Sequence, residues 1–250
     1  MIQLKDVSFA YPGTERKILN NLNLDIDDGE FLCIIGHSGC GKSTLLRLLA
    51  GLDAPQGGTV LADGEPVTGP SVDRTMVFQQ YSMFPWMNVK KNVVFAVHKT
   101  GKFSTAEAEE RADVFLKEVG LAADRGKYPY QLSGGMRQRA AIARALAMNS
   151  RYLLLDEPFG ALDTKIRKEL QELLQELWHS SGTSDEPKTV IFVTHDLEEA
   201  MILGSRIVFL QDGVISREKK IDRSINCCCI KKQGKEECMK MKEELAGWYR

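Results

Sequence analysis

Hydrophobic and polar residues follow two patterns along this chain. Continuous hydrophobic runs occur at residues 31–35, 152–155 and 189–193, and such runs are typical of strands buried on both faces of a parallel sheet. Residues 1–27 instead alternate hydrophobic with polar positions, as half-buried antiparallel strands do. Residues 57–67 predict a strand and turn that return to this small sheet. We therefore predict an α/β fold with a mainly parallel core sheet and an N-terminal antiparallel β subdomain.

Helical periodicity fills the segments between these strands. Residues 89–119 and 162–181 repeat hydrophobic positions at helical spacing, which predicts amphipathic helices packed on a core. The predicted inward-facing residues near the end of the first segment are Val114, Phe115, Leu116 and Val119. Because helices lie here between two sheet strands, we expect an inserted helical subdomain at about residues 88–150.

The chain changes character near residue 221. We predict one domain over residues 1–221. Residues 222–250 form a tail that is rich in lysine, glutamate and cysteine and shows little sustained hydrophobic periodicity. We interpret this tail as a marginal helix in which Leu245 and Trp248 dock on the core. The favoured interpretation is a solvated appendage without chemistry.

Composition narrows the class of protein. The 250 residues carry a net charge of −1, so no strongly basic face for nucleic acid is expected. The hydrophobic runs are far shorter than the ~20 residues that a membrane helix needs, and the N-terminus lacks a signal-peptide pattern. We therefore expect a cytoplasmic protein.

The six cysteines do not follow the spacing of a disulfide framework, which favours reduced thiols. A soft-metal site built from Cys227, Cys228, Cys229 and Cys238 is the alternative, although paired C-x-x-C spacing is missing. Cys40 lies beside a lysine at a predicted helix N-terminus, so we expect a lowered thiol pKa. Its alkylation would then block the neighbouring site.

Residues 36–44, GHSGCGKST, carry the most specific chemical signal. They fit the phosphate-loop pattern G-x-x-x-x-G-K-[ST] and lie between a predicted strand and a predicted helix. Glycines there let backbone N–H groups point inward, and the helix N-terminus adds positive partial charge. Lys42 would reach the β- and γ-phosphates, and Ser43 would complete a Mg²⁺ shell. The alternative is a glycine turn that merely joins strand to helix. The candidate nucleotide contacts are Gly36, His37, Ser38, Gly39, Cys40, Gly41, Lys42, Ser43 and Thr44.

Two acids and a histidine follow predicted central strands. Asp156 and Glu157 end the run at residues 152–157, at the sheet edge where α/β proteins place ligands. Asp156 can help to hold magnesium, and Glu157 can orient or deprotonate a water molecule. His195 follows another central strand, where it can contact a γ-phosphate or have a structural role.

Three further features leave alternatives open. Ser133, Gly134 and Gly135 precede an alanine-rich helix and form a second candidate phosphate grip, although one chain needs only one. Tyr11 either packs in a turn or stacks on an adenine ring. The hydrophobic side chains of residues 83–87 either enter a core or face a partner.

The ordered motifs resemble the ATP-binding cassette family of transporter ATPases. They are GHSGCGKST, Gln79, LSGGM, YLLLDEP, ALD and VTHD, spread over residues 36–196. The resemblance implies a P-loop NTPase cassette over residues 1–221 that hydrolyses ATP with Mg²⁺. It also implies a head-to-tail dimer in which the signature residues, Ser133, Gly134 and Gly135, bind the γ-phosphate held by the other subunit.

The resemblance implies a role for each matching residue. Catalytic roles fall to Glu157 as the base, His195 as the switch histidine, Gln79 of the glutamine lid loop, and Lys42. Tyr11 matches the adenine-stacking aromatic, and Asp163 matches the aspartate that contacts the other subunit. The implied metal ligands are Ser43, Gln79 and Asp156.

Met136 replaces the commoner glutamine of the signature motif. Together with FPWMNV, ALDTKIR and THDLEEAM, it is similar to the nitrate, sulfonate and taurine importer group. This likeness implies uptake of a small oxyanion, with membrane permease subunits, an extracytoplasmic solute-binding protein, and a peripheral location on the cytoplasmic face of the membrane. The alternatives are an exporter subunit and a soluble cassette protein acting on nucleic acid or ribosomes.

Overall fold

The computed structural model describes residues 1–250 except 15, 81, 182–186, 222–234 and 250. Alternating side chains at the N-terminus build a four-stranded antiparallel sheet in the order β2-β1-β4-β5, which confirms the predicted antiparallel subdomain. Its strands are β1 (Ile2–Phe9), β2 (Leu19–Ile26), β4 (Gly57–Ala62) and β5 (Glu65–Pro66).

The continuous hydrophobic runs build a second sheet, in the order β10-β9-β3-β8-β7-β6. All neighbouring strands are parallel except β10, which pairs antiparallel with β9. The predicted mainly parallel core sheet is therefore confirmed. Its strands are β3 (Phe31–Ile35), β6 (Arg74–Val77), β7 (Tyr152–Asp156), β8 (Thr189–Val193), β9 (Arg206–Gln211) and β10 (Val214–Lys220).

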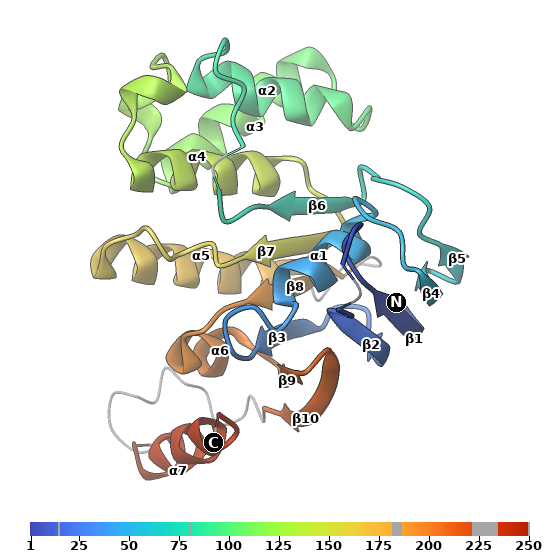
Figure 1. The fold of residues 1–250 in the computed structure, drawn as a ribbon. Helices are drawn as coiled ribbons and strands as arrows, with labels where there is room; N and C mark the ends of the chain where they lie inside the picture. The colour runs from blue at the N-terminus through green and yellow to red at the C-terminus, as the bar shows by residue number, and fades with distance from the viewer. Residues whose placement is uncertain (15, 81, 182–186, 222–234, 250) are drawn as a thin grey trace.

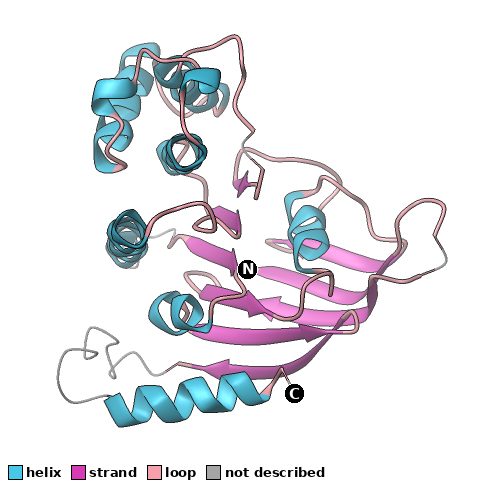
Figure 2. Ribbon diagram, turned by 60° about the vertical axis from the view of Figure 1, so that its left-hand side comes forward, coloured by secondary structure: helices cyan, strands magenta, loops and turns pink. Residues whose placement is uncertain are grey.

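Helices cover both faces of this sheet, which explains why its central strands are hydrophobic throughout. Leu32 and Ile34 of β3 pack in one core with α1 (Lys42–Ala50) and the antiparallel sheet. Phe31, Cys33 and Ile35 face the opposite core, which receives α5 (Thr164–Ser181) and α6 (Leu197–Leu203). Figure 2 shows helices on both sides of the stacked strands. Both cores hold the strand ends in place, and the candidate residues follow those ends.

The inserted helices form a group of their own beyond β6 (Figure 1). They are α2 (Val89–Lys99), α3 (Thr105–Glu118) and α4 (Gly134–Ala147), with short 3₁₀ turns at Ala122–Asp124 and Pro129–Gln131. Val114 was predicted to face inward, but it is exposed. The buried face of α3 carries Ala112 and Leu116, and a residue midway between two i, i+4 partners lies on the opposite side of a helix.

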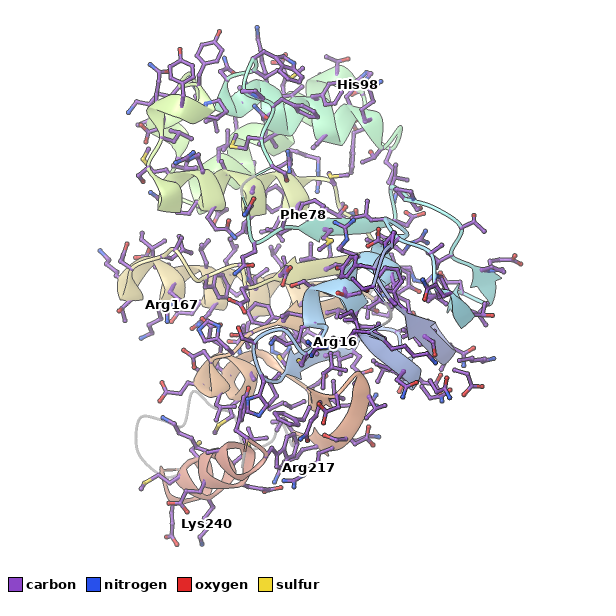
Figure 3. All side chains as sticks on the ribbon, viewed as in Figure 1. Arg16, Phe78, His98, Arg167, Arg217 and Lys240 are labelled. Carbon is purple, nitrogen blue, oxygen red and sulfur yellow. The ribbon has the colours of Figure 1, made fainter. Side chains whose placement is uncertain are left out.

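The tail contains a helix, α7 (Lys235–Gly247), that packs beside α6. Leu245 is fully buried and Trp248 nearly so, both in the same core as α5 and α6, which confirms their predicted docking. Lys240 projects from α7 away from the sheet (Figure 3). Within the described ranges, no helix combines the length and hydrophobicity needed to cross a membrane.

Candidate nucleotide site

The phosphate loop connects β3 to α1 through glycines in left-handed backbone conformations. Gly39 has a φ of 77° and Gly41 a φ of 109°, values that side-chain-bearing residues rarely adopt. A Cβ atom on Gly36 would lie 2.3 Å from the carbonyl oxygen of Leu210, so no larger residue fits there. The loop can therefore curl closely around a ligand at the N-terminus of α1.

Lys42 is a buried cation held by the loop's own carbonyl groups. Its side chain is 7% exposed, and Nζ donates hydrogen bonds to the oxygen of Gly36 at 2.8 Å and that of His37 at 2.9 Å. Neutral carbonyls satisfy the donors but leave the positive charge uncompensated. The site is thus electrostatically suited to an anion such as a phosphate group.

The expectation of a lowered pKa for the Cys40 thiol is wrong. Burial raises the pKa of the Cys40 thiol above its ordinary value, and this effect outweighs the opposing attraction of Lys42. A thiol shielded from water in this way stays protonated at neutral pH, because the thiolate loses more hydration than the lysine returns. Cys227, Cys228 and Cys229 of the proposed metal site lie outside the described residues.

Ser43 and Asp156 bring together two oxygen groups from different elements. The Ser43 hydroxyl at the start of α1 donates to Asp156 Oδ1 at the end of β7 over 3.1 Å. Asp156 is 5% exposed, and burial raises its pKa, with the hydrogen bond from Ser43 opposing the rise. Hard oxygen ligands of this kind fit Mg²⁺, whose charge would compensate the buried carboxylate.

Two other predicted catalytic side chains approach the carboxylate of Glu157. His195 Nδ1 lies 3.2 Å from Glu157 Oε2, and Gln79 Nε2 approaches the same oxygen at 3.5 Å. These side chains come from the segments after β7, β8 and β6, so the adjacent parallel strands deliver them to one sheet edge. A carboxylate, an imidazole and an amide gathered here can position a water molecule.

The backbone of Glu157 is itself unusual. Its φ is 45°, in the left-handed region, and its N–H donates to the oxygen of Val193 in the next strand at 3.0 Å. A non-glycine residue there costs about 1–2 kcal/mol. The sheet therefore holds the carboxylate in place at some expense in stability.

Tyr11 lies beside the phosphate loop, at the end of the antiparallel sheet. Its hydroxyl is 3.0 Å from Thr44 Oγ1, and Phe9 packs edge-on against its ring. The ring is 41% exposed, so it has surface left for stacking. Both interpretations of Tyr11, turn packing and adenine stacking, are compatible with this placement.

The signature residues lie elsewhere, at the N-terminus of α4. Ser133 is exposed and accepts a hydrogen bond from Met136 N at 3.3 Å as the helix cap. A Cβ atom on Gly135 would lie 3.2 Å from the oxygen of Ala161, next to the loop that carries the exposed Asp163. Within the described part of the chain, no hydrogen bond or ion pair joins the signature residues to the phosphate loop.

Two side chains near the site were missed by sequence reasoning. Gln138 of α4 is 2% exposed and donates to the oxygen of Pro158, after Glu157, at 2.9 Å. The sequence signal that could have identified Gln138 is a polar residue on the buried side of an alanine-rich helix. Tyr249, after α7, accepts a hydrogen bond from Gly36 N at 3.1 Å. No local sequence pattern predicts that contact.

Comparisons with known proteins agree with this geometry. Residues 19–160 match the family model described as ABC transporter. The chain is 45% identical to the nitrate import ATP-binding protein NrtD of Synechocystis sp., over 88% of this chain and 82% of that protein. It is 44% identical to the taurine import ATP-binding protein TauB of Chromobacterium violaceum, over 83% of this chain and 77% of that protein.

A solved structure shares the fold as well. It is the dimeric post-hydrolysis state of an ATP-binding cassette bound to ADP and Pi, with a TM-score of 0.80 and 38% sequence identity. The match covers 89% of this chain and 99% of that one.

Proposed function

Because this chain belongs to the ABC transporter family, we propose that it is the ATP-hydrolysing subunit of an importer for a small oxyanion such as nitrate, a sulfonate or taurine. The nitrate and taurine importers among its relatives support this cargo class. The observation that carries the chemistry is the convergence of Lys42, the Ser43–Asp156 pair and Glu157 on neighbouring strand ends.

The family motifs give each group a role in this proposal. Backbone N–H groups of the phosphate loop and Lys42 bind the β- and γ-phosphates. Ser43, Asp156 and Gln79 would hold Mg²⁺, which would supply positive charge that neutralises the transferred phosphoryl group. Glu157 orients a water molecule in line with the leaving group and accepts its proton, and His195 contacts the γ-phosphate.

The signature residues act in a second copy of the chain. Ser133 is exposed, and among the described residues no hydrogen bond or ion pair joins the signature residues to the phosphate loop, so they would complete a pocket only when another subunit presents them. The dimeric cassette with bound ADP and Pi supports this arrangement. Electrostatic stabilisation of the transferred phosphoryl group then comes from both subunits, and Asp163 contacts the partner beside the shared nucleotide.

The loop after Gln79 is the proposed contact with a permease. Trp86 is 69% exposed, while Phe84 packs against both Trp86 and Phe95. An exposed aromatic anchored on a packed one is suited to receive a short helix of a membrane partner. The subunit would then sit at the cytoplasmic face of the membrane, with an extracytoplasmic solute-binding protein delivering the cargo.

Purification of the tagged chain from detergent-solubilised membranes of its host tests this function. We expect permease subunits and a solute-binding protein to co-purify, and binding assays of that protein would identify the oxyanion. Trp86→Asp should lose the permease while retaining ATP binding. Tyr130→Asp is the matched control, since Tyr130 is also exposed on the helical subdomain.

Other outcomes would contradict the proposal. Co-purification of nucleic acid or ribosomes in place of permeases would favour a soluble cassette protein. Permeases without any solute-binding protein would favour an exporter.

A further inference from the structure

The C-terminal end of the chain reaches the first residue of the phosphate loop. The Tyr249 hydroxyl accepts a hydrogen bond from the N–H of Gly36 at 3.1 Å, across 213 positions of sequence. Burial raises the pKa of Tyr249, so its hydroxyl remains a neutral phenol at physiological pH. The contact thus needs no charge change to persist.

Aromatic packing holds the Tyr249 ring at this point. Its ring centroid is 5.1 Å from that of His37 and 4.9 Å from that of Phe209, and both contacts are edge-on. Trp248 also packs on Phe209. Tyr249 therefore touches the phosphate loop through both its hydroxyl and its ring.

Contacts at the N–H, the carbonyl oxygen and the Cα atom restrict the position of Gly36. Its N–H binds Tyr249, and its carbonyl oxygen accepts from Lys42 Nζ at 2.8 Å. The carbonyl of Leu210 occupies the place where a side chain would project. Movement of this residue would displace the carbonyl that holds the Lys42 ammonium group.

Helix α7 is fastened to the domain independently of this contact. Leu245 is fully buried, Glu244 forms an ion pair with Lys219 of β10, and Lys242 Nζ lies 2.5 Å from Glu198 Oε1 of α6. Buried hydrophobic contact fixes the helix more firmly than its exposed ion pairs do. Tyr249 is thus presented from a packed element.

We propose that Tyr249 is a positioning residue for the phosphate loop, through which the C-terminal helix increases the affinity for the phosphates of the nucleotide. The hydroxyl fixes Gly36, and Gly36 fixes the carbonyl that orients Lys42. This rests on the proposed role of residues 36–44 in phosphate binding. Since the contact is made with the loop rather than with reacting atoms, it supports nucleotide binding in the ground state and transition state alike.

Calorimetric titration of the full chain with ADP, compared with Tyr249→Phe, tests the proposal. Phenylalanine keeps the ring contacts and removes only the hydroxyl. We expect ADP affinity to fall roughly three- to tenfold, as loss of one hydrogen bond predicts. The KM for ATP should rise by the same factor with kcat unchanged, and Gly36 should exchange its amide hydrogen faster.

Tyr130→Phe is the control, because it makes the same substitution on an exposed side chain and should leave ADP affinity unchanged. Glu244→Gln removes a tether of α7 without touching the ring, so a smaller loss of affinity is expected. If both Tyr249→Phe and Glu244→Gln bind ADP as tightly as the wild type, Tyr249 has only a packing role.

Lys42→Ala separates this inference from the proposed function. Wild-type binding of ADP that Lys42→Ala abolishes supports the phosphate-loop assignment, whatever Tyr249→Phe does. A wild-type protein that does not bind ADP would overturn both proposals.

Discussion

The phosphate loop and the signature residues are both glycine-containing turns that open a helix, yet their surroundings differ. Lys42 is buried and bonded to two loop carbonyls, and Ser43 is bonded to Asp156. Among the residues that the structure describes, the Ser133 side chain makes only a local cap, to Met136 N. A polar group satisfied by distant elements is organised within its own chain, whereas an exposed cap leaves its helix N-terminus available to another molecule. This difference is what the proposed shared pocket requires: the phosphate loop is the half organised within the chain, and the signature residues are the half offered to a partner subunit.

The largest effect is expected at the self-contained half. Glu157→Gln should lower ATP turnover by about a thousandfold, because the amide cannot accept the proton of water. ATP binding should persist, and the ATP-bound dimer should accumulate. Phosphate release and light scattering measure the two quantities, with the exposed Glu172→Gln as control. Normal turnover in Glu157→Gln would show that another group is the base.

The offered half is tested by Ser133→Ala. Loss of a hydrogen bond to a charged phosphate should reduce turnover roughly 10- to 100-fold. ATP affinity of the dilute monomer should stay within about twofold of the wild type, since one subunit binds without the other's serine. Turnover per subunit in the wild type should also fall on dilution. Full activity at extreme dilution, unaffected by Ser133→Ala, would refute the shared pocket.

A smaller effect is expected at Tyr11. Tyr11→Ala should weaken ATP binding roughly tenfold if the ring stacks on adenine, and Tyr11→Phe should retain most of the affinity. Equilibrium binding of a fluorescent adenine nucleotide provides the measurement. If Tyr11→Ala lowers only the thermal unfolding midpoint, the ring packs in the turn and does not touch the base.

The smallest effect is expected at Ser104, which caps α3 as Ser133 caps α4. Ser104 Oγ accepts from Glu107 N at 3.3 Å, and Glu107 accepts from Ser104 N in return. Ser104→Ala should lower the free energy of unfolding by about 1 kcal/mol, measured by urea denaturation. Turnover should be unchanged. A loss of turnover equal to that of Ser133→Ala would mean that both serines act only through helix stability.

Sequence reasoning succeeded where the information is local. The strand ending at Ile35, the positive-φ glycines and the helix beginning at Lys42 follow from residue types a few positions apart. The order of the strands in the sheet could not be predicted from the hydrophobic pattern, because a hydrophobic run does not show which other strand it pairs with. The convergence of Gln79 and His195 on Glu157 depends on that order. The family resemblance supplied the roles of these residues but not their contacts.

The errors at Cys40 and Val114 have a shared origin. Proximity to Lys42 suggested a lowered Cys40 pKa, but burial by the surrounding fold dominates. Val114 is hydrophobic, but α3 packs on the core through the face that carries Ala112 and Leu116, and Val114 lies opposite that face. Both properties are determined by how far the rest of the chain excludes water, which no short window reports.

The tail contains one prediction that succeeded and one contact that was missed. Leu245 and Trp248 were predicted to dock because large hydrophobic residues favour burial. Tyr249 looked no different from an ordinary last-turn residue, and its hydrogen bond to Gly36 depends on where α7 comes to rest. A contact so distant in sequence needs the folded chain to reveal it.

At Glu157, the left-handed backbone opposes the stability of the fold to the rate of ATP hydrolysis. Glycine adopts that conformation freely, so Glu157→Gly would relieve local strain while discarding the carboxylate. Directed evolution that rewards heat resistance alone would therefore drift toward inert proteins at this position. A search for stabilising substitutions in this ATPase should therefore keep Glu157 unchanged and vary other positions.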